Sequence, residues 1–158
     1  MKEVVILVGL PGAGKSTYCQ SVLAEHVRIS QDEGPRTFPG VLHSLEQLVQ
    51  AGVERIVIDR TNPLRHQRDL FAQVARTHGY RVRIIHFDVP RSLCEQRILA
   101  RKDHPTLDAS RMHQAFDRYE QCLDIPTPQE CDNLVTIGAD SLDRSPPSPP
   151  AGRQECQK

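Results

Sequence analysis

Short runs of aliphatic residues alternate with longer amphipathic stretches along the chain. The runs predict five buried strands, over 4–8, 26–30, 55–59, 82–87 and 134–137. Between them, apolar positions three or four residues apart predict helices over 16–25, 41–50, 64–78, 90–99 and about 108–121. This alternation predicts an α/β fold with a central, mostly parallel five-stranded sheet flanked by helices.

The last part of the chain has a different composition. Proline and serine dominate the run SPPSPP at 145–150, and such a segment cannot pack a core. We therefore expect one folded domain over 1–140 and a disordered tail or linker over 141–158. The length of 158 residues suits a single domain.

Charge and cysteine content narrow the functional classes. The 20 basic and 20 acidic residues cancel, so no global field draws the protein to a nucleic acid or a membrane, and a polyanionic partner needs a local basic patch. The five cysteines are scattered without CxxC spacing, which favours a reducing, cytoplasmic setting without a disulfide framework or zinc site. No apolar run is long enough to span a bilayer, and we expect no membrane partner.

Residues 9–17, GLPGAGKST, follow the first predicted strand and match the phosphate-binding pattern G-x-x-x-x-G-K-[ST] at every fixed position. Glycines let such a loop curl so that its N–H groups point at phosphate oxygens. Lys15 is expected to reach the β- and γ-phosphates of a nucleotide, and the Ser16 hydroxyl to hold Mg²⁺. The expected nucleotide-binding residues of the run are Gly12, Ala13, Gly14, Lys15, Ser16 and Thr17.

Three acidic residues, Asp32, Asp59 and Asp88, lie at or just after the ends of predicted strands, at the edge of a parallel sheet where ligands bind. Asp32 is a candidate general base for phosphoryl transfer to an alcohol, or else a turn or capping residue. Asp59 is a candidate metal ligand of the Walker-B kind, or else a structural residue that pairs with a nearby cation. The expected ligands of Mg²⁺ or Mn²⁺ are Ser16, Asp32 and Asp59.

Short polar side chains and arginines surround the same edge. Thr61 and Asn62 are candidates for substrate contact and for the N-cap of the helix that follows. A basic patch on the acceptor side would be formed by Arg36, Arg60, Arg65 and Arg68. For the last two, a solvated helix face is an equally ordinary interpretation.

Arg97 and Arg101 are four residues apart and share one face of a predicted helix, just before the polar segment 103–105. They are candidates for a helical lid that closes arginines over the phosphates. The alternative is a pair of solvated surface arginines.

These elements occur in a specific order. They are the loop at 9–17, Ile29-x-x-Asp32, Ile58-Asp59-x-Thr61-Asn62, the run 86–90 and Arg97-x-x-x-Arg101. Together they resemble the kinase domain of the polynucleotide 5′-hydroxyl kinase family, from residue 2 to about 137. The resemblance implies a P-loop NTPase/kinase fold with a helical lid, and transfer of the γ-phosphate of ATP or GTP to the 5′-OH end of RNA or DNA.

The resemblance also implies residue roles. Asp32 would take the proton from the 5′-OH, and Lys15, Ser16 and Arg101 would handle the nucleotide phosphates with help from Arg97. Acceptor contacts would come from Arg36, Arg60, Thr61 and Asn62. The chain departs from the family pattern twice. Arg36 lies four residues after the base instead of three, and Arg60 stands where relatives often carry an acidic or amide residue.

Other functions remain open at this point. A small-molecule kinase, acting on a nucleoside, a sugar or, as in zeta-type toxins, a nucleotide sugar, shares the loop, the acidic base and the lid arginines. A regulatory nucleotide-binding switch would hydrolyse NTP without an acceptor. No D-x-D-G-T phosphatase motif follows the kinase elements, so an end-processing domain or ligase would have to be fused to the chain or associated with it.

Overall fold

The computed structural model describes residues 1–30, 34, 37–101 and 109–139. Asp32, Arg36 and the segment 141–158 lie outside the described residues. The elements in chain order are β1 (Glu3–Gly9), α1 (Lys15–Ser21), β2 (Val27–Ser30), α2 (Phe38–Gln50), β3 (Arg55–Asp59), α3 (Arg65–Thr77), β4 (Arg81–Asp88), α4 (Arg91–Ala100), α5 (Ala109–Cys122), the 3₁₀ turn η1 (Pro128–Glu130) and β5 (Asn133–Gly138).

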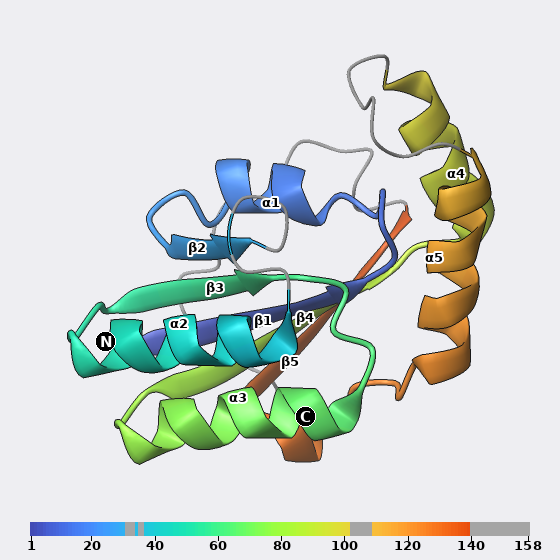
Figure 1. The fold of residues 1–158 in the computed structure, drawn as a ribbon. Coiled ribbons are helices and arrows are strands. Elements are labelled where there is room, and N and C mark those ends of the chain that lie inside the picture. Colours follow the sequence, from blue (N-terminus) through green and yellow to red (C-terminus); the bar gives the residue numbers. More distant parts are fainter. Residues whose placement is uncertain (31–33, 35–36, 102–108, 140–158) are drawn as a thin grey trace.

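The strands form one sheet in the order β2-β3-β1-β4-β5, and every neighbouring pair is parallel. This confirms the predicted fold class. Helices α2 and α3 cover one face of the sheet, and α1, α4 and α5 lie on the other side (Figure 1). The phosphate loop follows the central strand β1, so residues that end the flanking strands lie beside it.

Strand β1 shows why the sheet is covered on both faces. Val4, Ile6 and Val8 pack into the core beneath α2 and α3, whereas Val5 and Leu7 pack into the core on the α1 side. All five side chains are fully buried. Since successive side chains of a strand point to opposite faces, a continuous aliphatic run is what a doubly covered central strand requires.

Several helix ends differ from the sequence prediction. Helix α1 ends at Ser21, with Val22 as C-cap, so the predicted end at residue 25 is wrong. Helix α2 begins earlier than predicted, at Phe38, because Thr37 is its N-cap and accepts a hydrogen bond from the Gly40 N–H at 3.2 Å. Both differences are set by local capping, which apolar periodicity does not report.

An ionic cluster of Glu3, His26 and Arg83 joins the start of β1 to β4 and to the turn before β2. The Oε2 atom of Glu3 lies 2.7 Å from Nε2 of His26 and accepts a 2.8 Å hydrogen bond from Nη2 of Arg83. Burial raises the pKa of the Glu3 carboxyl, but the hydrogen bond with His26 and the charge of Arg83 outweigh it, and the pKa falls to about 2. Glu3 is therefore held as a carboxylate over the usual pH range.

Among the described residues, no helix is both long and apolar enough to cross a membrane.

Candidate active site

The phosphate loop joins β1 to α1 in a shape that its glycines make possible. Gly12 and Gly14 have φ angles of +82° and +101°, in the left-handed region that favours glycine. A Cβ on Gly12 would also lie 2.8 Å from the carbonyl oxygen of Cys94 in helix α4. The Ala13 N–H donates to the Leu10 carbonyl at 3.1 Å and closes the turn. Gly12 is thus required both by its φ angle and by the close approach of α4.

Lys15 lies folded against its own loop. Its side chain is buried, and Nζ donates hydrogen bonds to the carbonyl oxygens of Gly9 and Leu10, at 2.9 and 2.7 Å. Both acceptors are neutral backbone carbonyls. A phosphate oxygen forms a stronger, charge-assisted bond with an ammonium, so a nucleotide can compete for this group.

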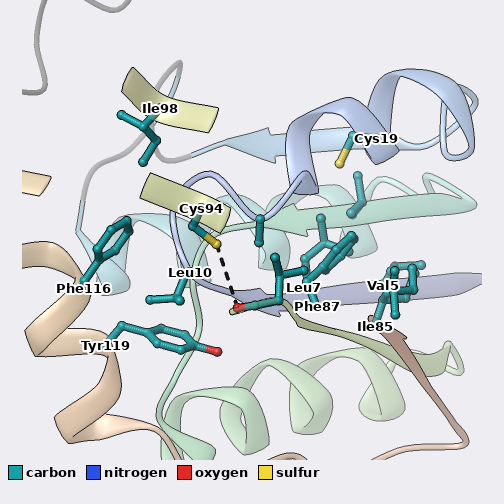
Figure 2. Close-up of a cluster of buried hydrophobic side chains, with 14 of the residues drawn as sticks. Val5, Leu7, Leu10, Cys19, Ile85, Phe87, Cys94, Ile98, Phe116 and Tyr119 are labelled. Carbon is teal, nitrogen blue, oxygen red and sulfur yellow. Dashed lines mark hydrogen bonds between the residues drawn. The ribbon is translucent and has the colours of Figure 1, made fainter. Parts of the chain in front are cut away.

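Helices α4 and α5 back the loop with apolar side chains. Cys94 and Ile98 of α4 and Phe116 and Tyr119 of α5 gather around Leu10 (Figure 2). The Cys94 thiol donates to the carbonyl of Val89 at 3.9 Å, which is the dashed line in Figure 2. Burial raises the pKa of this thiol, so Cys94 is a packing residue here.

The two predicted lid arginines differ in position. Nη1 of Arg97 lies 3.5 Å from the carbonyl oxygen of Ala13, beside the phosphate loop. Arg101 is the C-cap of α4, with extended backbone, and its side chain is exposed. The structure therefore brings Arg97 to the loop and leaves Arg101 in solvent at the end of the same helix.

Ser16 and Asp59, two of the predicted metal ligands, are in direct contact. The Ser16 hydroxyl donates to Oδ2 of Asp59 at 3.1 Å, and Asp59 is buried at the end of β3. A hydroxyl and a carboxylate are hard oxygen donors of the kind that Mg²⁺ binds, usually together with phosphate and water oxygens. The donor set therefore fits Mg²⁺. Groups of three or more His, Cys, Asp or Glu side chains that could hold a metal are absent from the described residues.

Arg28 of β2 is a third member of this cluster, which sequence reasoning missed. Its Nε donates to Oδ2 of Asp59 at 2.8 Å, and its Nη2 lies 2.7 Å from the same oxygen and 3.1 Å from Oγ of Ser16. The available signal was a charged residue inside a short apolar strand. Ser30 pairs with Asp59 across β2 and β3, so Arg28, two residues before Ser30, lies close to Asp59.

The connection between β3 and α3 is tied to β1. The Gly9 N–H donates to the Thr61 carbonyl at 3.1 Å, and the Asn62 side-chain amide donates to the Leu7 carbonyl at 2.7 Å. Asn62 is buried with a φ angle of +47°. Its Oδ1 atom is buried and has no hydrogen-bond partner among the described residues, so the structure ties the side chain to β1 through its amide nitrogen. The predicted N-cap role of Thr61 or Asn62 is wrong, because Leu64 caps α3.

Arg68 lies in the core, so both sequence interpretations, a solvated face and a phosphate contact, are wrong for this residue. It is 1% exposed and forms a two-point ion pair with Glu130, with Nε to Oε1 at 2.8 Å and Nη2 to Oε2 at 3.1 Å. Its Nη1 donates to the carbonyls of Asn62 and Pro63, each at 2.9 Å. Arg68 therefore fixes the backbone of the β3–α3 connection.

Arg60 follows β3 and has an unusual environment. Its Nε and Nη1 atoms are buried and have no hydrogen-bond partner within the described part of the chain. The guanidinium lies 5.9 Å from the ring centroid of Phe38, and burial lowers its pKa. Buried donors without partners are costly in a native structure, and an anion at this edge would satisfy them.

A family model described as an AAA domain, AAA_33, matches residues 4–123. The chain therefore belongs to the AAA_33 family, and it has the P-loop kinase fold. Among curated proteins, it is 27% identical over 137 residues to a bifunctional polynucleotide phosphatase/kinase of Schizosaccharomyces pombe, a match that covers 82% of this chain and 31% of that protein. The chain thus spans less than a third of the curated relatives it matches.

Two solved structures illustrate the range of proteins with this fold. A sugar kinase from Janibacter sp. superposes with a TM-score of 0.65 at 21% identity and covers 92% of this chain and 88% of its own. A fungal RNA kinase superposes with a TM-score of 0.64 at 12% identity, over 93% of this chain and 40% of its own. At these identities the likeness establishes the fold alone.

Proposed function

We propose that the protein is a polynucleotide 5′-hydroxyl kinase, which transfers the γ-phosphate of ATP or GTP to the 5′-OH end of RNA or DNA. The observation that carries the proposal is the position of Arg60 at the carboxyl edge of the sheet, with Nε and Nη1 buried and without a hydrogen-bond partner among the described residues. A phosphate next to the acceptor nucleoside is the anion that this cation suits. The similarity to a polynucleotide phosphatase/kinase over 82% of the chain supports the same acceptor.

On the donor side, Lys15 exchanges the carbonyls of Gly9 and Leu10 for the β- and γ-phosphates. Ser16 and Asp59 supply oxygen ligands for Mg²⁺ or Mn²⁺, with Asp32 as the third predicted ligand. The bound metal would neutralise phosphate charge.

On the acceptor side, Asp32 accepts the proton of the 5′-OH as its oxygen attacks the γ-phosphorus. The new O–P bond forms as the bond from the γ-phosphorus to the β–γ bridging oxygen breaks, and the nucleoside diphosphate leaves in line. Arg97 and Arg101 stabilise charge on the transferring group. Arg36, Arg60 and Thr61 hold the acceptor strand, together with Asn62 if its amide is released.

A small-molecule kinase is the second candidate. The observation that favours it is the similarity in fold to a sugar kinase, which superposes with a TM-score of 0.65 over 92% of this chain. The discriminating property is salt dependence, because acceptor binding through several phosphates weakens steeply with salt and binding of a neutral sugar does not.

The test is transfer of labelled γ-phosphate from Mg²⁺·NTP to short 5′-OH oligonucleotides, RNA and DNA side by side, with nucleosides and sugars as competing acceptors. We expect oligonucleotide labelling that Asp32→Asn abolishes while NTP still binds. Arg60→Gln should raise the KM for the oligonucleotide without changing the KM for NTP. Arg55→Gln is the matched control, because Arg55 is a half-exposed arginine at the opposite end of β3.

If only a sugar or a nucleoside is labelled, the protein is a small-molecule kinase and not a polynucleotide kinase. An unchanged oligonucleotide KM in Arg60→Gln would remove Arg60 from the acceptor site.

A further inference from the structure

The cation nearest to the predicted metal ligands is a side chain of the protein itself. The Nη2 atom of Arg28 is within hydrogen-bond distance of both Oδ2 of Asp59 and Oγ of Ser16, at 2.7 and 3.1 Å. Its Nε donates to the same carboxylate oxygen at 2.8 Å. The guanidinium thus places a positive charge where the two oxygen donors converge.

We propose that Arg28 is a positioning residue that holds Ser16 and Asp59 together in the nucleotide-free protein and competes with Mg²⁺ for these two oxygen donors. The inference rests on the proposed binding of Mg²⁺·NTP, but not on the nature of the acceptor.

The occupancy of the two oxygens explains the competition, because Oδ2 of Asp59 already has the Ser16 hydroxyl and both Nε and Nη2 of Arg28 within hydrogen-bond distance. Its hydroxyl proton is directed to Asp59, and one of its two lone pairs accepts from Arg28. A metal ligated by the hydroxyl would take the second lone pair and would then lie next to the guanidinium. The metal and the guanidinium would also be two cations around one carboxylate, where their mutual repulsion raises the cost of joint occupancy.

The fold lets the side chain of Arg28 leave without disturbing the sheet. Its backbone is held by the parallel pairing of β2 with β3, in which Arg28 lies opposite Val57. The side chain is 23% exposed, so it has a route to solvent. Nucleotide phosphates bring negative charge to the same edge and offset the loss of the Arg28–Asp59 pair. Metal should therefore bind well only together with nucleotide.

The experiment measures the Mg²⁺ dependence of ADP binding by calorimetry, with no acceptor present. In Arg28→Gln the apparent Mg²⁺ affinity of the ADP-bound protein should rise by roughly fivefold or more, the lower end of coupling between linked sites. The melting temperature of this variant should fall without ligand, because Asp59 loses its cationic partner, and should approach that of the wild type in Mg²⁺·ADP.

Arg55→Gln is the matched control, because Arg55 lies on the neighbouring strand β3 and makes an exposed ion pair with Glu25. It should leave the Mg²⁺ dependence unchanged. If Arg28→Gln does not fold, Arg28→Lys is tested in its place. A lysine keeps the positive charge but cannot donate from two nitrogens to Asp59, so we expect an Mg²⁺ affinity between that of the wild type and that predicted for Arg28→Gln. An unchanged or weaker Mg²⁺ affinity in the folded variant overturns the proposal. Because no acceptor is used, failed phosphate transfer to oligonucleotides would leave this result standing.

Discussion

The buried pair of Arg68 and Glu130 allows a sharp prediction about stability. Replacing Arg68 by methionine keeps most of the stem volume but removes five hydrogen bonds, two to the Glu130 carboxylate and three to the backbone carbonyls of Asn62, Pro63 and Asp124. The carboxylate then remains buried without its cation, since the Glu130 side chain is 1% exposed.

Removing one partner of a buried ion pair costs about 3–5 kcal/mol, a large part of the roughly 5–15 kcal/mol that stabilises a typical domain. For a domain of this size we expect the melting temperature of Arg68→Met to fall by roughly 10 °C. The assay is urea unfolding followed by circular dichroism, with thermal melting beside it. Arg65→Met is the control in the same helix, because Arg65 only reaches the exposed Asp69, at 3.5 Å, and should cost less than about 0.5 kcal/mol.

The double variant Arg68→Met/Glu130→Met separates the cost of an unpaired buried carboxylate from the cost of the lost backbone hydrogen bonds. Replacing a whole buried pair by apolar side chains is often tolerated, so the double variant should be more stable than Arg68→Met alone. A loss below about 1 kcal/mol in Arg68→Met, or equal losses in Arg65→Met and Arg68→Met, would refute the reasoning.

Three further predictions concern the loop and the pH dependence. Gly12→Ala should abolish nucleotide binding. Gly52→Ala is its control, because Gly52 has a φ of +78° but open space around the new Cβ; it should lose about 1–2 kcal/mol of stability and keep nucleotide binding. Equal nucleotide binding in both variants would contradict the role of helix α4 at the loop. Lys15→Met should remove the thermal stabilisation that Mg²⁺·ADP gives to the wild type, and a retained shift would count against the phosphate contact. The pKa of Glu3, about 2, lies below its ordinary value of 4.5, so its contribution to stability is present above about pH 4.5 and is lost as the pH falls toward 2. Melting curves of Glu3→Gln should show a weaker acid dependence than the wild type, while Glu25→Gln, at an exposed site, should follow the wild type.

The sequence predicted those parts of the molecule that depend on local pattern. Aliphatic runs identified the strands, and the spacing of glycine, lysine and serine identified the phosphate loop. The pairing of Arg68 with Glu130 joins residues 62 positions apart, and no local pattern distinguishes a buried arginine from a solvated one at the start of a helix. The role of Arg28 could not be predicted either, because it depends on which strand lies next to β2 in the sheet.

Thr37 and Asn62 show a second limit. The N-cap of α2 and the left-handed turn at Asn62 depend on single side-chain hydrogen bonds, which compete with many similar local alternatives in an unfolded chain. The sequence offered Asn62 as a cap or a substrate contact, and the fold uses its amide to join two strand ends.

The ties between the phosphate loop and the β3–α3 connection have a consequence for how acceptors can change. The bonds from Gly9 to Thr61 and from Asn62 to Leu7, together with the hydrogen bond from Arg68 to Asn62, join the phosphate loop to the connection that carries Arg60 and Thr61. In the proposed kinase, this backbone geometry would fix the distance from the γ-phosphate to the attacking oxygen. A new acceptor could be accommodated by exchanging the side chains at positions 60 and 61, while the in-line alignment of donor and acceptor stays intact.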